Sequence, residues 1–247
     1  MSDALIMTGR SLRLSRRNID ALITSMALPV MMLLIFVYFF GGAIDTGTRY
    51  VTYVVPGVLL LCAGFGSANT AMAVTEDLKS GIIDRFRSLD IGGTPILTGH
   101  VLASAARNSL ATTLVLCLAF AIGFRPSATL SGWLAAAAVL LAYILALSWL
   151  SAAIGLFVKS SEAAGGFTFF VSFLPYPSSA FVPTDTMPGW LQSFAAHQPV
   201  TQVIETLRGL LLGQPVGTTP WVALAWCAGI LAVSAGASGL LFRRRTA

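Results

Sequence analysis

The sequence predicts an all-α integral membrane protein with six transmembrane helices, and three observations support this fold class. Of the 247 residues, 56% are hydrophobic and only 10% are charged, whereas soluble domains carry roughly 25% charged residues. The mean hydropathy is +0.81. Several apolar stretches reach the roughly 20 residues that a helix needs to cross a hydrocarbon core. No polar stretch is long enough to bury a core of its own, so residues 1–247 are expected to form one transmembrane domain.

Residues 1–20 are expected to form an amphipathic helix that lies in the membrane interface. Arginines spaced three and four residues apart share one helical face, and apolar residues seven apart lie on another. Basic groups on such a helix lie close to lipid phosphates. The basic face comprises Arg10, Arg13 and Arg17, and the apolar face comprises Leu5, Leu12 and Ile19. An ordinary solvated basic tail is the alternative for this segment.

The six predicted spans cover residues 21–40, 51–75, 99–123, 132–158, 161–182 and 220–242. The first span is too long for the apolar core of a cleaved signal peptide, and no A-x-A site follows it. The three cysteines, Cys62, Cys117 and Cys227, all lie in apolar stretches. They are interpreted as small packing residues rather than as a disulfide framework or a metal site.

The distribution of basic residues orients these spans. With both termini in the cytoplasm, 12 of the 15 lysines and arginines fall on or near the cytoplasmic side, and only Arg49, Arg125 and Arg208 fall outside. This is a clear positive-inside bias, and it explains the net charge of +5 better than nucleic-acid binding does. The excess of arginine over lysine is typical of a GC-rich bacterial genome, so we expect a multi-pass protein of a bacterial inner (plasma) membrane.

The stretch EDLKSGIIDRFRSLDI, residues 76–91, joins the second and third spans on the cytoplasmic side. Leu78, Ile82, Phe86 and Leu89 recur at helical spacing, which predicts one amphipathic helix with an apolar face. Two glycines and a proline then end the segment by residue 95. This helix either lies on the membrane surface or docks a cytosolic partner. Its mixture of acids and bases favours a protein partner, because a helix selected for lipid surfaces is mostly basic.

The connection between the fifth and sixth spans is predicted to form a re-entrant helical hairpin over residues 183–215 on the outer side. It is too apolar for a water-exposed loop, and prolines break it into short pieces, with a split expected near Pro199. Re-entrant backbone is tolerated where protein buries it or where it lines a cavity. Glu205 and Arg208 are three residues apart and are expected to form a local ion pair.

The sequence lacks the motifs of an ATP-binding or hydrolytic enzyme. It contains no G-x-x-x-x-G-K-[ST] loop that would cradle ATP phosphates, no H-E-x-x-H, no Cys/His cluster and no G-x-S-x-G. His100 and His197 are predicted on opposite sides of the membrane and are interpreted as interfacial polar residues. An ion-coupled secondary transporter is the rival class, but such proteins place a carboxylate or histidine in mid-span, and the predicted spans hold almost none.

Two stretches are distinctive: EDLKSGIIDRFRSL after the second span, and AFVPTDTMPGWLQSF with HQPVTQVIETLRGLLLG before the sixth. With these motifs, the whole chain resembles a type-2 ABC exporter permease of the daunorubicin/doxorubicin-resistance type. The resemblance implies that the segment after the second span is a coupling helix seated on an ATPase subunit. It also implies that the fifth span and the outer hairpin gate a pathway shared within a dimer.

Three sets of candidate residues follow. The resemblance implies an ATPase-coupling set of Glu76, Asp77, Leu78, Ile82, Asp84, Arg85, Phe86 and Leu89, and a gate set of Pro183, Pro188, Trp190, Glu205 and Arg208. Candidates for the substrate pathway are Ser67, Asn69, Thr70, Phe169, Phe170 and Phe173. The alternative for the three polar pathway residues is hydrogen bonding within their own helix.

The resemblance also implies the assembly. A homodimer of this chain with two copies of a separate ABC ATPase is the simplest arrangement, in which the chain itself binds no cofactor and the partner ATPase binds ATP and Mg. The sequence departs from the family at Asp90, where proline is common, and at His100, where arginine or lysine is common. Both positions lie at the coupling end, so the details of docking there are specific to this chain.

The chemistry of the predicted spans indicates the kind of cargo. The spans offer apolar and aromatic surface with almost no fixed charge, and a highly charged cargo would lose its hydration there without replacement partners. We therefore expect export of a hydrophobic or amphipathic compound, either an antibiotic-like drug or a lipid. A polysaccharide exporter is the alternative within the same fold.

Overall fold

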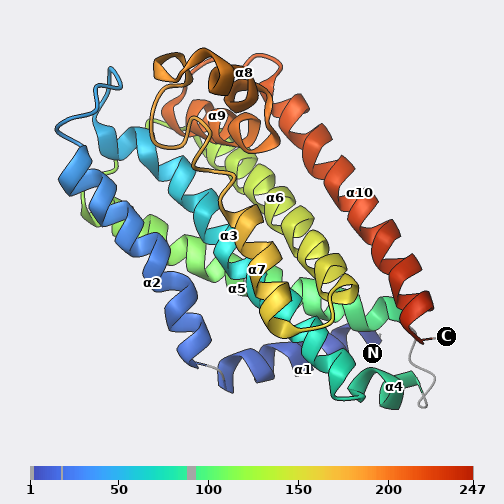
Figure 1. Ribbon diagram of the computed structural model, residues 1–247. Helices are drawn as coiled ribbons and strands as arrows, with labels where there is room; N and C mark the ends of the chain where they lie inside the picture. Colours follow the sequence, from blue (N-terminus) through green and yellow to red (C-terminus); the bar gives the residue numbers. More distant parts are fainter. Residues whose placement is uncertain (1–2, 18, 88–92, 247) are drawn as a thin grey trace.

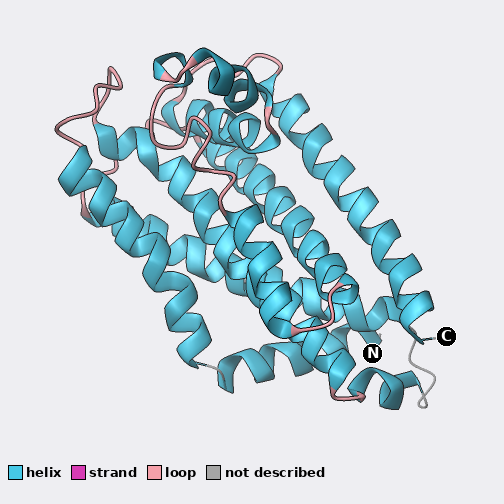
Figure 2. Cartoon of the chain, in the orientation of Figure 1, coloured by secondary structure: helices cyan, strands magenta, loops and turns pink. Residues whose placement is uncertain are grey.

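The structure is a computed structural model that describes residues 3–17, 19–87 and 93–246, and these residues form helices joined by loops, with no strand among them (Figure 2). The α-helices are α1 Asp3–Arg17, α2 Ile19–Ile35, α3 Tyr50–Lys79, α4 Ile82–Arg87, α5 Gly93–Ala121, α6 Leu130–Phe157, α7 Ser161–Ser172, α8 Gly189–His197, α9 Pro199–Leu212 and α10 Thr219–Thr246. A π-helical turn, Phe36–Phe40, continues α2, and Thr184–Thr186 forms a 3-10 turn. The predicted all-α class is confirmed.

The helices form one elongated bundle with two distinct ends. Figure 1 shows α1, α4 and both chain termini at one end, and α8 and α9 at the other. We call these the α4 end and the α9 end. Among the described residues, α3, α5, α6 and the part of α10 up to Phe242 are long and apolar enough to cross a membrane. The apolar helix Met26–Phe40 is shorter, and α7 has 12 residues.

The expected helical span over residues 161–182 is wrong in its second half. The α-helix α7 ends at Ser172, and residues 173–182 form a series of turns that carry the chain toward the α9 end. Pro175 and Pro177 lie in this segment. Proline lacks a backbone N–H donor and its ring clashes with the preceding helical turn, so two prolines this close prevent the helix from continuing.

Helix α3 is the central element of the bundle. In its most apolar window, 83% of the residues are buried within the chain, compared with 17% for α10, which lies at the edge (Figure 1). Small residues let neighbouring backbones approach it closely. A Cβ atom at Gly57 would lie 2.6 Å from the Cβ and 2.8 Å from the Cα of Ala180, and a Cβ at Gly64 would lie 3.3 Å from the Cα of Ser172. The α7 segment and the turns after it therefore pack directly against α3.

The Gly57 contact gives a first prediction. Gly57→Ala should destabilise the fold, because the added methyl group would overlap the backbone of residue 180, and overpacking of this kind costs about 1–3 kcal/mol. We expect a lower midpoint of thermal unfolding in detergent. Gly229→Ala in α10 is the matched control, since nothing lies within 4 Å of the position of its Cβ. Equal midpoints for the two variants would contradict the close packing of α3 against residue 180.

Candidate functional site

The α4 end differs from the single amphipathic helix that the sequence predicted over residues 76–91. Helix α3 continues to Lys79, the chain turns at Ser80 and Gly81, and the six-residue helix α4 begins at Ile82. Gly81 has a positive φ of 68°, a conformation that glycine adopts without steric cost. The expectation of one continuous coupling helix was therefore wrong, because this glycine permits a reversal that helical periodicity does not register.

The predicted coupling residues consequently lie on two helices. Glu76 and Arg85 are exposed, and Leu78 and Ile82 are half-buried on opposite sides of the turn. Asp84 and Phe86 belong to α4, but their side chains, like the whole of Leu89, lie outside the described residues. The buried apolar anchor of α4 is Ile83, which is 2% exposed and belongs to a cluster that also contains Met7, Val74, Ile96, Leu97 and Phe242. Sequence reasoning missed Ile83 because the helical spacing of Leu78, Ile82, Phe86 and Leu89 assigned the apolar face to those residues instead.

Asp77 is buried and joins three helices rather than facing a partner. Its carboxylate accepts two hydrogen bonds from the Arg10 guanidinium of α1, with Nη1–Oδ2 at 2.7 Å and Nη2–Oδ1 at 3.0 Å. The Nε2 atom of His100 in α5 lies 3.0 Å from Oδ2. This two-point contact between a guanidinium and a carboxylate is among the strongest polar contacts in proteins. We call Arg10, Asp77 and His100 the α4-end ion cluster.

The α4-end ion cluster changes the interpretation of the first helix. Arg10 was expected to face lipid phosphates, yet it points into the protein and pairs with α3. Close backbone packing supports the same attachment, because a Cβ at Gly99 of α5 would lie 2.9 Å from the carbonyl carbon of Met7 in α1. Helix α1 is thus fixed to the bundle. The departure from the family at His100 also acquires a structural role as a partner of Asp77.

The second prediction tests this attachment. Arg10→Ala should lower stability by an amount below the roughly 3–5 kcal/mol seen when a fully buried ion pair is broken, because Arg10 retains 22% side-chain exposure. Arg13→Ala, one turn along the same helix, should stay within about 0.5 kcal/mol, since Arg13 is exposed. Unfolding in detergent measures both. A double-mutant cycle between Arg10 and Asp77 should return a clear interaction energy, and a value near zero would refute the pairing.

The α9 end contains the two short helices that the sequence predicted, with the split in the expected place. Helix α8 ends at His197 and α9 begins at Pro199, where a proline is well tolerated because the first N–H groups of a helix have no partner within it. The side chain of Gln198, between them, donates hydrogen bonds to the carbonyl oxygens of Leu174 and Pro177. This contact ties the hairpin to the turns that follow α7.

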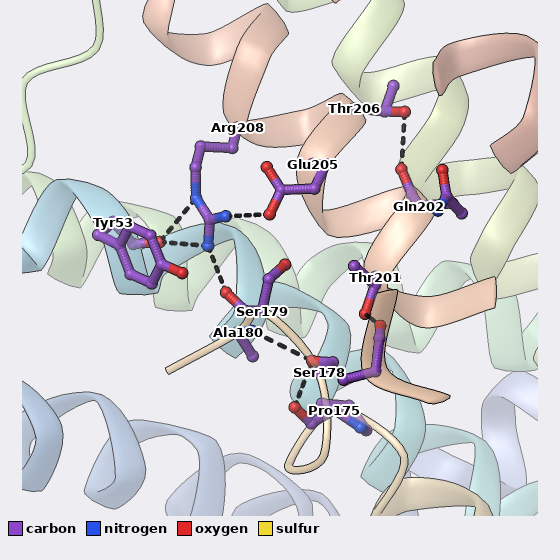
Figure 3. A network of polar contacts seen from close by, with 11 residues as sticks. Tyr53, Pro175, Ser178, Ser179, Ala180, Thr201, Gln202, Glu205, Thr206 and Arg208 are labelled. Atoms are coloured by element: carbon purple, nitrogen blue, oxygen red, sulfur yellow. Dashed lines mark hydrogen bonds and ion pairs between the residues drawn. The ribbon is translucent and has the colours of Figure 1, made fainter. Parts of the chain in front are cut away.

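Arg208 is the most heavily bonded charged residue described at the α9 end. It is buried, and its guanidinium lies over the Tyr53 ring with Cζ 3.7 Å from the ring centre (Figure 3). Nε and Nη2 donate to the carbonyl oxygen of Tyr53, and Nη2 also donates to that of Ser179 at 2.6 Å. Nη1 lies 2.5 Å from Oε1 of Glu205, which confirms the predicted pair. One cation therefore holds α9, the start of α3 and the segment after α7 together.

A polar cavity of about 360 Å³ opens beside this guanidinium. Ligand sites in proteins commonly measure about 300–1,000 Å³. Its lining comprises Thr46, Thr48, Tyr53, Ser179, Pro183, Thr184, Asp185, Glu205, Arg208, Leu212 and Gln214. We call it the α9-end pocket. Of the gate residues named from the sequence, Pro183, Glu205 and Arg208 line it, whereas Trp190 is 79% exposed in α8 and Pro188 precedes that helix.

The pathway candidates divide into a buried set and an exposed set. Ser67 and Thr70 are buried, with the Ser67 hydroxyl donating to the Gly64 carbonyl of its own helix and Thr70 Oγ1 accepting from Arg107 at 3.3 Å. Asn69 is half-buried. Phe169, Phe170 and Phe173 are exposed on and just after α7. Ser67 thus bonds within its own helix, as in the alternative interpretation, Thr70 links α3 to α5, and the three aromatic residues are exposed.

Two of these exposed rings, Phe169 and Phe173, belong to a continuous row of aromatic side chains. Neighbouring ring centres are 4.0–6.4 Å apart, within or close to the range of favourable aromatic pairs. The row runs from α3 along α7 and its turns to the end of α2, through Phe65, Phe169, Phe173, Tyr176, Phe181, Phe36 and Phe40. We call it the aromatic row. Sequence reasoning named single members of it but not their alignment, which depends on the packing of three helices.

Comparison with known proteins assigns the class. The chain belongs to the ABC-2 type transporter family, whose model matches residues 3–212. It is 30% identical over 228 residues to the daunorubicin resistance ABC transporter permease protein DrrB1 of Streptomyces coeruleorubidus, covering 92% of this chain and 81% of the relative. It is 26% identical over 246 residues to the probable doxorubicin resistance ABC transporter permease protein DrrC of Mycobacterium tuberculosis strain CDC 1551, covering 99% and 89%.

Proposed function

We propose that the chain is the permease subunit of an ATP-driven exporter that moves a hydrophobic or amphipathic compound out of a bacterial cell. The observation that carries this proposal is the family membership together with a bundle whose described acidic residues lie at its two ends. Relatives that match over nearly the whole chain are named as permeases of daunorubicin and doxorubicin resistance. A drug-like or lipid-like cargo fits these relatives and the exposed members of the aromatic row, Phe40, Phe169 and Phe173.

A six-span topology with both termini in the cytoplasm is part of this proposal. Helix α2 and its π-helical turn are contiguous over residues 19–40, which is long enough to cross a hydrocarbon core. The short helix α7 and the turns after it make a further pass between the two ends (Figure 1). Added to the four long apolar helices, these two passes give six. The termini then lie at the α4 end, where the basic residues gather.

The α4 end is the proposed docking surface for the ATPase. Glu76, Lys79 and Arg85 are exposed there within one turn-and-helix unit, and they mix both signs of charge. Mixed charges suit a complementary protein surface and set the register of docking. Asp77 anchors the end of α3 to α1 and α5. A displacement of α4 would therefore be transmitted to α1, α3 and α5 together. The chain supplies no nucleotide-binding motif, so two copies of a separate ATPase would bind ATP and Mg.

A homodimer is the proposed assembly, with the aromatic row beside the shared pathway. Exposed aromatic side chains offer apolar contact without fixed charge, and large exposed patches of this kind mark interaction surfaces. Phe169, Phe170 and Phe173 would then meet either the cargo or the partner protomer. The hairpin of α8 and α9 would dip into the outer leaflet and close the outer end of the pathway.

The third prediction concerns the source of energy. The purified chain should hydrolyse ATP no faster than a blank preparation, because its sequence contains no phosphate-binding G-x-x-x-x-G-K-[ST] motif. Adding the separately expressed ABC ATPase should yield a complex whose hydrolysis responds to apolar amphipathic compounds. Hydrolysis by the chain alone would refute the division of labour between a permease and an ATPase.

The fourth prediction tests the docking surface by charge reversal. Arg85→Glu should reduce recovery of the ATPase with the permease by about tenfold at low salt, with a smaller effect at high salt, because exposed charges are screened there. Arg49→Glu is the matched control, since Arg49 is exposed just before α3 begins, at the opposite end of that helix. Both variants should reach the membrane in normal amounts. Equal recovery of the ATPase with the two variants would place the docking surface elsewhere.

A further inference from the structure

We propose that the α9-end pocket binds a primary ammonium group, carried by the exported compound as it leaves. This inference rests on the proposed export function for its biological meaning, although binding itself can be measured without transport. The pocket lies where the start of α3, the turns after α7 and helix α9 meet (Figure 3). Its chemistry follows from the hydrogen bonds that its residues have already made.

The arginine that lines the pocket is already occupied by the protein. Nε and Nη2 of Arg208 donate to the carbonyl oxygens of Tyr53 and Ser179, and Nη1 donates to Glu205. A guanidinium has five N–H donors in a fixed fork, so little donor capacity remains for an anionic ligand. The Tyr53 ring covers one of its faces. Arg208 therefore shapes the pocket and is not its recognition group.

Hydrogen-bond acceptors and negative charge remain available in the pocket. Glu205 has a second carboxylate oxygen, with 42% of its side chain exposed, and Asp185 is exposed on the same lining. With Arg208 counted against them, these two carboxylates leave the lining one negative charge in excess. A ligand that donates hydrogen bonds and carries one positive charge matches this balance.

A buried hydroxyl without a partner is the second, independent sign of a ligand. Ser179 lines the pocket and is only 2% exposed, yet its Oγ atom makes no hydrogen bond. Buried polar atoms without partners are rare in native structures, and each one calls for an explanation. Its neighbour Ser178 behaves in the usual way, since its hydroxyl donates to Pro175 and accepts from the N–H of Ala180. A bound donor group in the pocket would satisfy Ser179.

The position of Ser179 connects this pocket to the aromatic row. Tyr176 and Phe181, two members of the row, lie on the same turn segment as Ser179. On this segment the aromatic rings and the acceptor-rich pocket are neighbours. A compound with an apolar body and an amine would therefore contact both.

Two acidic side chains can also attract a metal ion. In the described part of the chain, however, no group of three or more His, Cys, Asp or Glu residues is placed to hold one.

The test measures binding of three isosteric probes to the full chain in lipid nanodiscs. Phenethylamine carries an ammonium, 2-phenylethanol is its neutral counterpart and phenylacetate its anionic one. Saturation-transfer NMR, referenced to empty nanodiscs, should show specific binding of phenethylamine at least about tenfold tighter than of the other two. Asp185→Asn should weaken that binding by about tenfold, since Asp185 carries charge into the pocket and makes no contact that holds the fold.

Ser179→Ala and Ser178→Ala form the matched pair. Ser179→Ala should weaken phenethylamine binding and leave thermal stability unchanged or higher, because it removes an unpaired buried hydroxyl. Ser178→Ala should lower stability and leave the affinity of the folded fraction unchanged. Phenylacetate binding as tightly as phenethylamine, or unchanged affinity in both Ser179→Ala and Asp185→Asn, would overturn the proposal. Intact binding in a chain that shows no ATP-driven export would refute the proposed function alone.

Discussion

A charged side chain at the centre of a bilayer costs roughly 2.5–3.5 kcal/mol in insertion measurements, and the architecture of this chain follows from that cost. In the described residues, every aspartate and glutamate lies on α1, near the end of another helix, or in the loops and short helices at the two ends of the bundle. The basic residues follow the same rule apart from Arg107, which reaches Thr70 of α3. Charge is therefore concentrated at the two ends of the bundle. The α4 end contains the cluster of Arg10, Asp77 and His100, and the α9 end contains the ion pair of Arg208 and Glu205.

Helix α3 makes contacts at both of these charged ends. At the α4 end Asp77 binds Arg10 and His100, and at the α9 end the carbonyl and ring of Tyr53 bind Arg208. Between these points the helix is mostly apolar, largely buried and closely packed against α7 and the segment after it. A displacement of α4 would thus be transmitted along a helix that is fixed at both ends, toward the hairpin that closes the α9 end. This arrangement gives the proposed coupling a continuous physical route.

The sequence predicted those features that depend on local chemistry. Long apolar stretches gave the class and the positions of the long helices, proline gave the split before α9, and i,i+3 spacing gave the pair of Glu205 and Arg208. Two local signals were present but were outweighed by periodicity. Gly81 interrupts the predicted coupling helix, and the prolines after Ser172 end α7. Both errors came from extending an apolar pattern through a residue that breaks helices.

Tertiary contacts lay beyond sequence reasoning. Asp77 and Arg10 are 67 residues apart, so no spacing rule could join them, and both had plausible partners outside the protein. The same holds for Arg208, whose carbonyl partners at Tyr53 and Ser179 are 155 and 29 residues away. The pocket beside Arg208 and the unpaired hydroxyl of Ser179 exist only because three distant segments meet. The ion cluster at the α4 end and the proposed pocket at the α9 end thus lie at contacts between distant segments, whereas the membrane class follows from composition.

The central claim is that the chain is a pathway whose energy comes from an ATPase and not from an ion gradient. Its most direct test is transport of an apolar amphipathic dye in inside-out vesicles that contain the chain together with its ATPase. We expect the dye to accumulate in the vesicles only when ATP is present. Accumulation should stop when the ATPase is inactivated and persist when a protonophore collapses the proton gradient. Accumulation driven by an imposed proton or sodium gradient without ATP would contradict the central claim, because the described spanning helices carry their carboxylates near their ends, as at Glu76 and Asp77 of α3, and none in mid-span.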